Sequence, residues 1–268
     1  MIFACDLDRT LIYSRNSMGT IDPAALVPVE IYDGKEHSFV TRDVYASLRM
    51  LGERMLFVPA TTRTHEQYRR VHGISEGLSP RYAIVSNGGK VLKDGMPDAD
   101  WEREVRTALR DGCAPGDEVS ERFIGLANEG LALRASYCDE LFYAYVLDME
   151  RLEEGFMTEL ETMLQGLGWS SSLQGRKLYL VPDPVSKGAA VRYVKELAGS
   201  SIVFAAGDSL LDECMLAVAD QAMAPCHGEL YRKYGSHGHI RFTESSGIRA
   251  SEEIINALLK RMEVSAAI

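Results

Sequence analysis

The sequence lacks most features that mark an exported, membrane-bound or disulfide-stabilised protein. Its 268 residues include only five cysteines, an odd number, and no two of them have the C-x-x-C spacing of a structural zinc site. Neither a disulfide framework nor zinc is therefore expected, and a reducing compartment follows. No apolar run approaches the roughly 18 residues of a membrane span, and the first residues carry no basic region. We expect a cytoplasmic protein that does not bind a membrane.

Positive charge is also scarce. Lysine and arginine number 29 against 39 aspartates and glutamates, a formal net charge of -10. Nucleic-acid binders usually need a basic surplus to neutralise phosphates, so nucleic acid is not expected as a partner. A small phosphorylated metabolite stays compatible, because its site needs only local positive charge. The composition, with 46% hydrophobic residues, predicts a globular chain with a sizeable core. It leaves the oligomeric state open.

Short apolar segments alternate with helical ones near both ends of the chain. Residues 2–5, 55–60 and 201–206 have the character of buried strands, and helical patterns follow the second and third of them. A third strand of the N-terminal part is predicted at 82–85. This alternation predicts an α/β fold with a doubly wound parallel sheet. Ligands of such sheets bind at the carboxyl ends of the strands.

The middle of the chain has a different pattern. Helical spacing at 101–110, 118–127 and 152–167 is mixed with strand-like segments at 131–136, 141–148 and 177–181. Such a mixture predicts a separate α+β layer with antiparallel strands. We therefore expect a core of residues 1–87 and 184–268 and an inserted domain of residues 88–183.

An acidic motif follows the first strand. In Asp6-Leu7-Asp8-Arg9-Thr10, two carboxylates at i and i+2 can face one pocket. Close carboxylates repel each other unless they share a proton or a cation, and Mg²⁺ prefers such hard oxygen ligands. Asp6 is then a candidate nucleophile for phosphorus, and Asp8 a candidate acid and base. The alternative is a solvated turn at the strand end.

Three more polar segments fall at strand ends or helix starts. Thr61 follows the strand at 55–60 and could donate to a phosphoryl oxygen, or Thr61 or Thr62 could merely cap the next helix. Lys187 begins a helix, where its charge opposes the macrodipole unless it pairs with an acid such as Asp6, and the alternative is a surface lysine. Asp208 and Asp212 follow the strand at 201–206, and the alternative for them is helix capping. The ordered combination is much more specific than any single motif.

The four segments resemble the four motifs of the haloacid-dehalogenase superfamily of phosphatases and phosphotransferases. Their order, the long insert and the segments Ser86-Asn87-Gly88-Gly89 and Val185-Ser186-Lys187-Gly188 resemble its Cof-type branch, subfamily IIB. That branch includes sucrose-phosphate and mannosyl-3-phosphoglycerate phosphatases. The resemblance implies a Rossmann-like core with an inserted α/β cap of C2 type.

The resemblance also implies roles for individual residues. The implied catalytic residues are Asp6, Asp8, Thr61 and Lys187. The implied substrate contacts are Thr10, Thr62, Arg63, Asn87 and Gly88. Magnesium is the implied cofactor. It would be held by the side chains of Asp6 and Asp208 and by the main-chain carbonyl of Asp8, and Asp212 would orient these groups without binding the ion directly.

The predicted function is magnesium-dependent hydrolysis of a small phosphate monoester, such as a sugar phosphate, through an aspartyl-phosphate intermediate. An acid at Asp8 suits protonation of a leaving alkoxide. Two alternatives are open at this point. One is a phosphomutase of the phosphomannomutase type, and the other is a non-enzymatic phospho-acceptor or binding module.

Overall fold

Residues 1–52, 54–235 and 238–266 are described by the structure, a computed structural model in which the chain divides into two units. Unit 1 consists of Met1–Asp98 and Lys187–Ile268, and unit 2 of Ala99–Ser186. Residues 88–98, which the sequence pattern assigns to the insert, lie in unit 1. That unit 2 acts as a cap stays a prediction.

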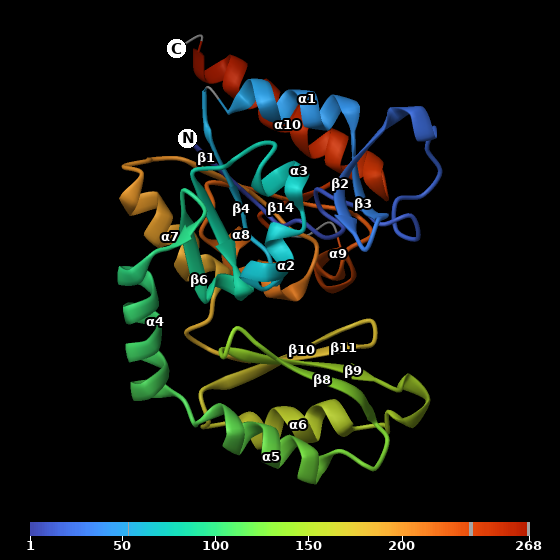
Figure 1. The fold of residues 1–268 in the computed structure, drawn as a ribbon, viewed down its shortest axis with the longest axis vertical. Coiled ribbons are helices and arrows are strands. Elements are labelled where there is room, and N and C mark those ends of the chain that lie inside the picture. The colour runs from blue at the N-terminus through green and yellow to red at the C-terminus, as the bar shows by residue number, and fades with distance from the viewer. Residues whose placement is uncertain (53, 236–237, 267–268) are drawn as a thin grey trace. The chain divides into compact units, whose positions relative to one another are not determined.

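A five-stranded sheet forms the centre of unit 1. All its strand pairs are parallel, which confirms the predicted fold class. β1, β4 and β12 are nearly fully buried, as expected of apolar strands with helices on both faces (Figure 1). The sheet order is β14 (Ile240–Phe242), β13 (Gln221–Ala224), β12 (Val203–Ala206), β1 (Ile2–Cys5) and β4 (Leu56–Pro59).

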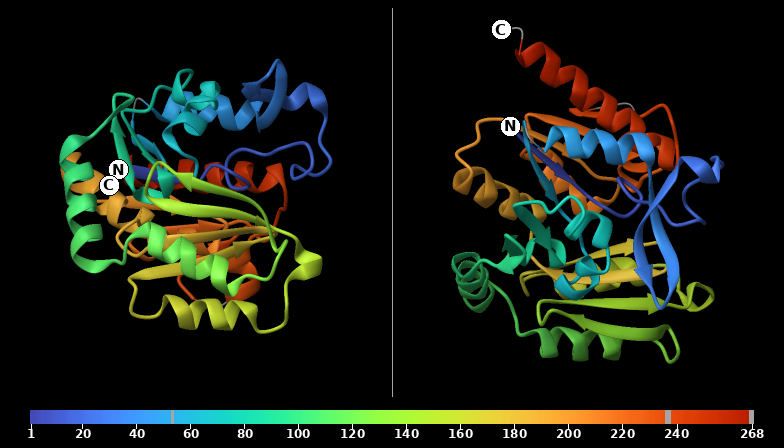
Figure 2. Two further views of the ribbon diagram at one scale, coloured as in Figure 1. Left: turned by 60° about the horizontal axis from the view of Figure 1, so that its bottom comes forward. Right: turned by 45° about the horizontal axis from the view of Figure 1, so that its top comes forward.

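Seven α-helices accompany this sheet in the described part of unit 1. They are α1 (Arg42–Leu51), α2 (His65–Arg69), α3 (His72–Ser75), α7 (Lys187–Leu197), α8 (Glu213–Ala217), α9 (Glu229–Tyr234) and α10 (Ile248–Ala266). The Thr41 hydroxyl caps α1 by accepting a hydrogen bond from the Val44 N–H. The apolar face of α1, formed by Val44, Leu48 and Leu51, is buried, and α1 lies beside α10 (Figures 1 and 2).

Two smaller sheets complete unit 1. A hairpin turn at Asp33-Gly34 joins β2 (Leu26–Tyr32) to β3 (Lys35–Thr41), and both turn residues have the positive φ of a type I′ turn. The predicted strand at 82–85 is β5 (Tyr82–Val85). It pairs antiparallel with β6 (Lys90–Lys93), which pairs with β7 (Met96–Pro97). A single parallel bridge, Ala60 to Ile84, links β5 to the end of β4.

Unit 2 has its own antiparallel sheet and its own core. The sheet order is β10 (Trp169–Gln174), β11 (Lys177–Pro182), β9 (Phe142–Leu147) and β8 (Ala132–Cys138). α5 (Gly116–Leu126) and α6 (Phe156–Leu164) cover one face of it, while α4 (Ala99–Gly112) leads into the unit (Figure 2). Phe123 and Leu160 from these two helices pack with Tyr145 and Leu180 of the sheet. Three of these four strands match segments predicted as strands, and only β10 was not predicted.

Among the helices of the described residues, none combines the length and the apolar character that a bilayer span requires.

The packing of α7 against α8 gives a test of the fold. A Cβ at Gly188 would lie 2.4 Å from the Cys214 carbonyl oxygen, whereas a Cβ at Gly125 in α5 would meet nothing within 4 Å. We expect Gly188→Ala to destabilise unit 1 by about 1–3 kcal/mol through overpacking. We expect Gly125→Ala to stabilise unit 2 by up to about 1 kcal/mol, since alanine favours helix.

Denaturant unfolding can separate the two effects. Both tryptophans, Trp101 and Trp169, lie in unit 2, so their fluorescence follows that unit, while far-UV circular dichroism follows both. A higher midpoint for Gly188→Ala would contradict the close approach of the two helices.

Candidate active site

The ends of three neighbouring strands gather the candidate residues. The Asp6 N–H donates to the Ala206 carbonyl on one side of β1, at 2.8 Å, and the Ala60 N–H donates to the Cys5 carbonyl on the other side, at 2.8 Å. Asp208 follows Ala206 by two residues, and Thr61 follows Ala60 directly. Continuation of the parallel ladder therefore puts Asp6, Thr61 and Asp208 at one edge of the sheet, as predicted for this fold.

Lys187 joins the first strand to the segment after β12. Its Nζ lies 2.7 Å from Asp6 Oδ1 and 2.5 Å from Asp212 Oδ1, although 181 residues separate Lys187 from Asp6. Its side chain is only 1% exposed. A lysine at the start of α7 opposes the helix dipole, and these two carboxylates compensate that misfit.

Three carboxylates surround this ammonium group. Oxygen atoms of Asp6, Asp208 and Asp212 all lie within 4.8 Å of one another, and all three residues are buried. The second oxygen of Asp212 accepts hydrogen bonds from the Ser209 N–H and hydroxyl, at 3.0 and 2.8 Å. Asp212 is thus held at both oxygens, and it in turn holds Lys187.

Burial and like charge disturb the titration of this cluster. Burial, followed by the Asp212 carboxylate, raises the pKa of Asp6 well above its ordinary value. The same two causes raise the pKa of Asp208 to about 7. Burial alone would lower the pKa of Lys187, but Asp212 and Asp6 outweigh it and raise that pKa. The cluster is therefore short of positive charge.

The cluster fits a magnesium ion by its donor chemistry. Three carboxylates against one ammonium group leave a formal charge of -2, which a divalent cation would neutralise. Mg²⁺ takes oxygen ligands and commonly uses one or two carboxylates together with substrate phosphate. Because Asp212 is already bonded at both oxygens, Asp6 and Asp208 are the better placed ligands.

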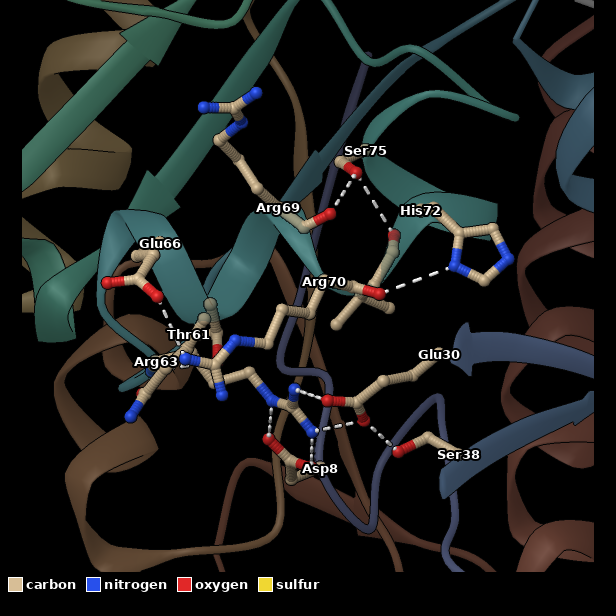
Figure 3. Close-up of polar contacts among 12 residues, drawn as sticks. Asp8, Glu30, Ser38, Thr61, Arg63, Glu66, Arg69, Arg70, His72 and Ser75 are labelled. Atoms are coloured by element: carbon tan, nitrogen blue, oxygen red, sulfur yellow. Dashed lines mark hydrogen bonds and ion pairs between the residues drawn. The ribbon is translucent and has the colours of Figure 1, made fainter. Parts of the chain in front are cut away.

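Asp8 belongs to a second set of charges. Arg63 donates from Nε to Asp8 Oδ2 at 2.7 Å and from Nη2 to Asp8 Oδ1 at 2.9 Å. It also donates from Nη1 to Glu30 Oε1 at 2.7 Å and from Nη2 to Glu30 Oε2 at 3.0 Å. Figure 3 shows the guanidinium between the two carboxylates, with Ser38 behind Glu30. Burial would lower the pKa of Arg63, but its bonds to Asp8 and Glu30 outweigh burial and raise it.

The predicted threonine site lies beside this set. The buried Thr61 hydroxyl oxygen accepts from the Arg63 N–H at 3.1 Å, which leaves its own O–H to donate. Neither Thr61 nor Thr62 caps α2, because Thr64 does so in a reciprocal capping box with Gln67. The capping alternative for this motif is therefore wrong for the helix that follows.

The remaining predicted substrate contacts are spread around the same loops. Asn87 is buried, and its N–H donates to the Thr61 carbonyl at 3.0 Å. It stands in a run of left-handed backbone with Ser86 and Gly88. The Thr10 hydroxyl is buried without a hydrogen-bond partner among the residues described. Thr62 is partly exposed. Their contact with substrate stays a prediction.

Several contacts of the site were not foreseen. Arg9 has φ of 65°, and its Nε lies 3.9 Å from Asp208 Oδ2. His227 Nε2 lies 3.0 Å from the Arg9 carbonyl, and its Nδ1 accepts from the Gly247 N–H at 3.2 Å, so Nε2 carries the proton. Glu30 and Ser38 were not foreseen either. No motif marks them, since their approach depends on how the hairpin packs.

Comparison with known proteins gives a family match over most of the chain. A family model described as sucrose-6F-phosphate phosphohydrolase matches residues 1–224, which include every candidate site residue above from Asp6 to Asp212. Among curated proteins, none matches the chain significantly.

Solved structures share the fold at low sequence identity. The sucrose-phosphatase of Synechocystis sp. PCC6803, solved with sucrose and phosphate, is 17% identical, with a TM-score of 0.66 over 96% of this chain and 97% of that one. A haloacid dehalogenase-like hydrolase of Bacillus subtilis is 15% identical, with a TM-score of 0.56 over 96% and 91%. A sugar phosphatase of subclass IIB is 11% identical, with a TM-score of 0.57 over 98% and 99%.

The buried lysine gives a direct test of this electrostatic arrangement. Without magnesium, we expect Lys187→Met to lower the free energy of unfolding by about 3–5 kcal/mol, because buried carboxylates lose their cation. Lys195→Met, on the same helix, removes a partly exposed lysine 4.0 Å from Asp220 and should change it by less than about 1 kcal/mol. Equal effects of the two variants in urea unfolding would contradict the arrangement.

Proposed function

Since this chain belongs to the sucrose-6F-phosphate phosphohydrolase family and is a phosphoric monoester hydrolase of the haloacid-dehalogenase type, we propose that it hydrolyses a small sugar phosphate with Mg²⁺ and an aspartyl-phosphate at Asp6. The observation that carries the proposal is the bridge from Lys187 to Asp6 and Asp212 within the three-carboxylate cluster. Because the family consists of enzymes, a non-enzymatic phospho-acceptor is not proposed.

Asp6 is the proposed nucleophile. Its Oδ1 is held by Lys187, which leaves Oδ2 to form a bond to phosphorus while the bond from phosphorus to the sugar oxygen breaks. The fixed ammonium of Lys187 and the O–H of Thr61 would stabilise the charge on the phosphoryl oxygens. Magnesium, held by Asp6 and Asp208 with the main-chain carbonyl of Asp8, would neutralise that charge further.

Asp8 is the proposed acid and base. It would give a proton to the departing sugar oxygen, and it would then take a proton from the water that attacks the phosphorylated Asp6. Its carboxylate is half exposed, at 50%, whereas Asp6 is buried. A group that exchanges protons with substrate and water suits the more open of the two positions.

The substrate class follows from the family and from one neighbour. The Synechocystis sucrose-phosphatase contains sucrose and phosphate, so sucrose 6F-phosphate is the first compound to assay. The predicted substrate contacts at Thr10, Thr62, Asn87 and Gly88 belong to this proposal, whereas the guanidinium of Arg63 bonds to Asp8 and Glu30. A cytoplasmic location is also part of the proposal, and the five free cysteines support it.

The covalent route predicts a specific loss. We expect Asp6→Asn to lower phosphate release from sucrose 6F-phosphate by at least about 1,000-fold, because an amide is a poor nucleophile. Acid quenching of the wild-type enzyme with ³²P-labelled substrate should trap a phosphorylated protein, and the variant should trap none. Isomerised sugar phosphate instead of inorganic phosphate would favour a mutase, and an active Asp6→Asn enzyme would exclude the covalent route.

The metal site can be tested without turnover. We expect Mg²⁺ at about 100 times its Kd to stabilise the protein by about 2.7 kcal/mol, because it binds only the folded cluster. Asp208→Asn should lose most of this shift in thermal unfolding, and Asp43→Asn, an exposed acid in α1, should keep it. If Asp208→Asn keeps the full stabilisation by magnesium, the ion binds at another site. If the enzyme stays active after treatment with a chelator, the reaction does not need magnesium.

A further inference from the structure

Arg63 is held by more than its contact with Asp8. Its three nitrogens make four hydrogen bonds to two carboxylates, two to Asp8 and two to Glu30, at 2.7–3.0 Å. Two-point bonding of this kind fixes both the distance and the plane of a guanidinium group. Glu30 therefore sets the direction from which Arg63 meets Asp8 (Figure 3).

Glu30 is itself firmly placed. Its side chain is 10% exposed, against 17% for Arg63 and 50% for Asp8, so burial increases from Asp8 toward Glu30. The Ser38 hydroxyl donates to Glu30 Oε2 at 2.5 Å from the opposite strand of the hairpin. Glu30 is therefore held by a buried partner other than Arg63, and from this position it can restrain Arg63 and, through Arg63, Asp8.

An irregularity in the hairpin turns Glu30 toward Arg63. The register between β2 and β3 shifts on both sides of Glu30, so that Val29 has no partner on β3. Such bulges redirect side chains. Val29 is fully buried against α3, where a Cβ added to Gly73 would lie 2.7 Å from Val29 Cγ1. The hairpin is thus fixed to the core beside Glu30.

We propose that Glu30 is a positioning residue for the acid and base chemistry of Asp8, acting through Arg63, with Ser38 as its support. This inference rests on the proposed function, because it needs Asp8 to exchange protons with the leaving group. Without Glu30, the guanidinium of Arg63 could rotate about its remaining partner, and the half-exposed Asp8 would follow it. A displacement of about 1 Å in a reacting group can cost about 100-fold in rate.

The leaving group distinguishes positioning of Asp8 from general damage. A sugar alkoxide is a poor leaving group and needs the proton from Asp8, whereas 4-nitrophenolate leaves without one. A mispositioned Asp8 therefore slows phosphorylation of Asp6 by a sugar phosphate much more than by 4-nitrophenyl phosphate. Removal of phosphate from Asp6 uses Asp8 with both substrates, so the first step must be measured alone.

The test compares Glu30→Gln with Glu36→Gln. Glu36 lies on the same hairpin and bonds to Arg15 at 3.1 Å, but both side chains are exposed and lie outside the proposed machinery. With excess enzyme, we expect Glu30→Gln to slow single-turnover cleavage of sucrose 6F-phosphate by about 10- to 100-fold. The single-turnover release of 4-nitrophenol should stay within about threefold, and the steady-state KM should change little. Glu36→Gln should match the wild type in all three measurements.

The possible outcomes distinguish a failure of the proposed role of Glu30 from a failure of the proposed phosphatase function. A wild-type enzyme that hydrolyses neither ester removes the proposed function. The role of Glu30 is overturned if the wild type is active and the Glu30→Gln variant is unchanged, is faster, or is slowed equally with both esters. The proposed function would not be affected by that result. If Glu30→Gln does not fold, Ser38→Ala decides the question. The Ser38→Ala variant should show the same selective slowing with sucrose 6F-phosphate, but to a smaller degree. Wild-type rates with both esters in this variant would overturn the proposal.

Discussion

The ion pair of Lys187 with Asp6 and Asp212 is the interaction on which the rest of the site depends. Buried charges are costly unless they are paired, and Lys187 is the only ammonium group that the described structure brings to the three-carboxylate cluster. The pair also joins segments 181 residues apart in the chain. Loop closure over such a distance is less unfavourable than the length suggests, because its cost grows only with the logarithm of length and unit 2 has a core of its own. The inserted unit can therefore interrupt the core sequence without separating the charged groups that the fold must unite.

The sheet supplies the geometry that makes this pairing possible. β1 lies between β12 and β4 in parallel register, so the residues that follow each strand leave the sheet at one edge. That edge was predictable from sequence, because apolar strands that end abruptly at Asp6, Thr61 and Asp208 leave few other places for their polar side chains. The pairing of Lys187 with an acid was predictable for a related reason, since a cation at a helix start opposes the helix dipole unless an acid lies nearby.

Other parts of the fold gave no such signal. β13 has the sequence Gln-Ala-Met-Ala and β14 only three residues, and neither has the β-branched run typical of buried strands. β10 is rich in serine and is a strand because β11 pairs with it along its whole length. The contacts of Glu30 were also invisible in the sequence. They depend on the shifted register of the hairpin and on the packing of Val29, both of which are set by tertiary structure.

The two acids of the first motif end in different surroundings, and this difference is what the proposed reaction requires. Although only one residue separates them, Asp6 is buried against Lys187, whereas Asp8 is half exposed and bonded to Arg63. Two close carboxylates that shared one environment would compete for one cation or one proton. Separate cations reduce that competition. The proposed Mg²⁺ would add the positive charge that lets Asp6 react as a carboxylate, while Asp8 exchanges protons with substrate and water. Lys187 is fixed by Asp212, and Arg63 is fixed by Glu30. Each reacting acid therefore has a cation, and each cation has a second acid that holds it in place.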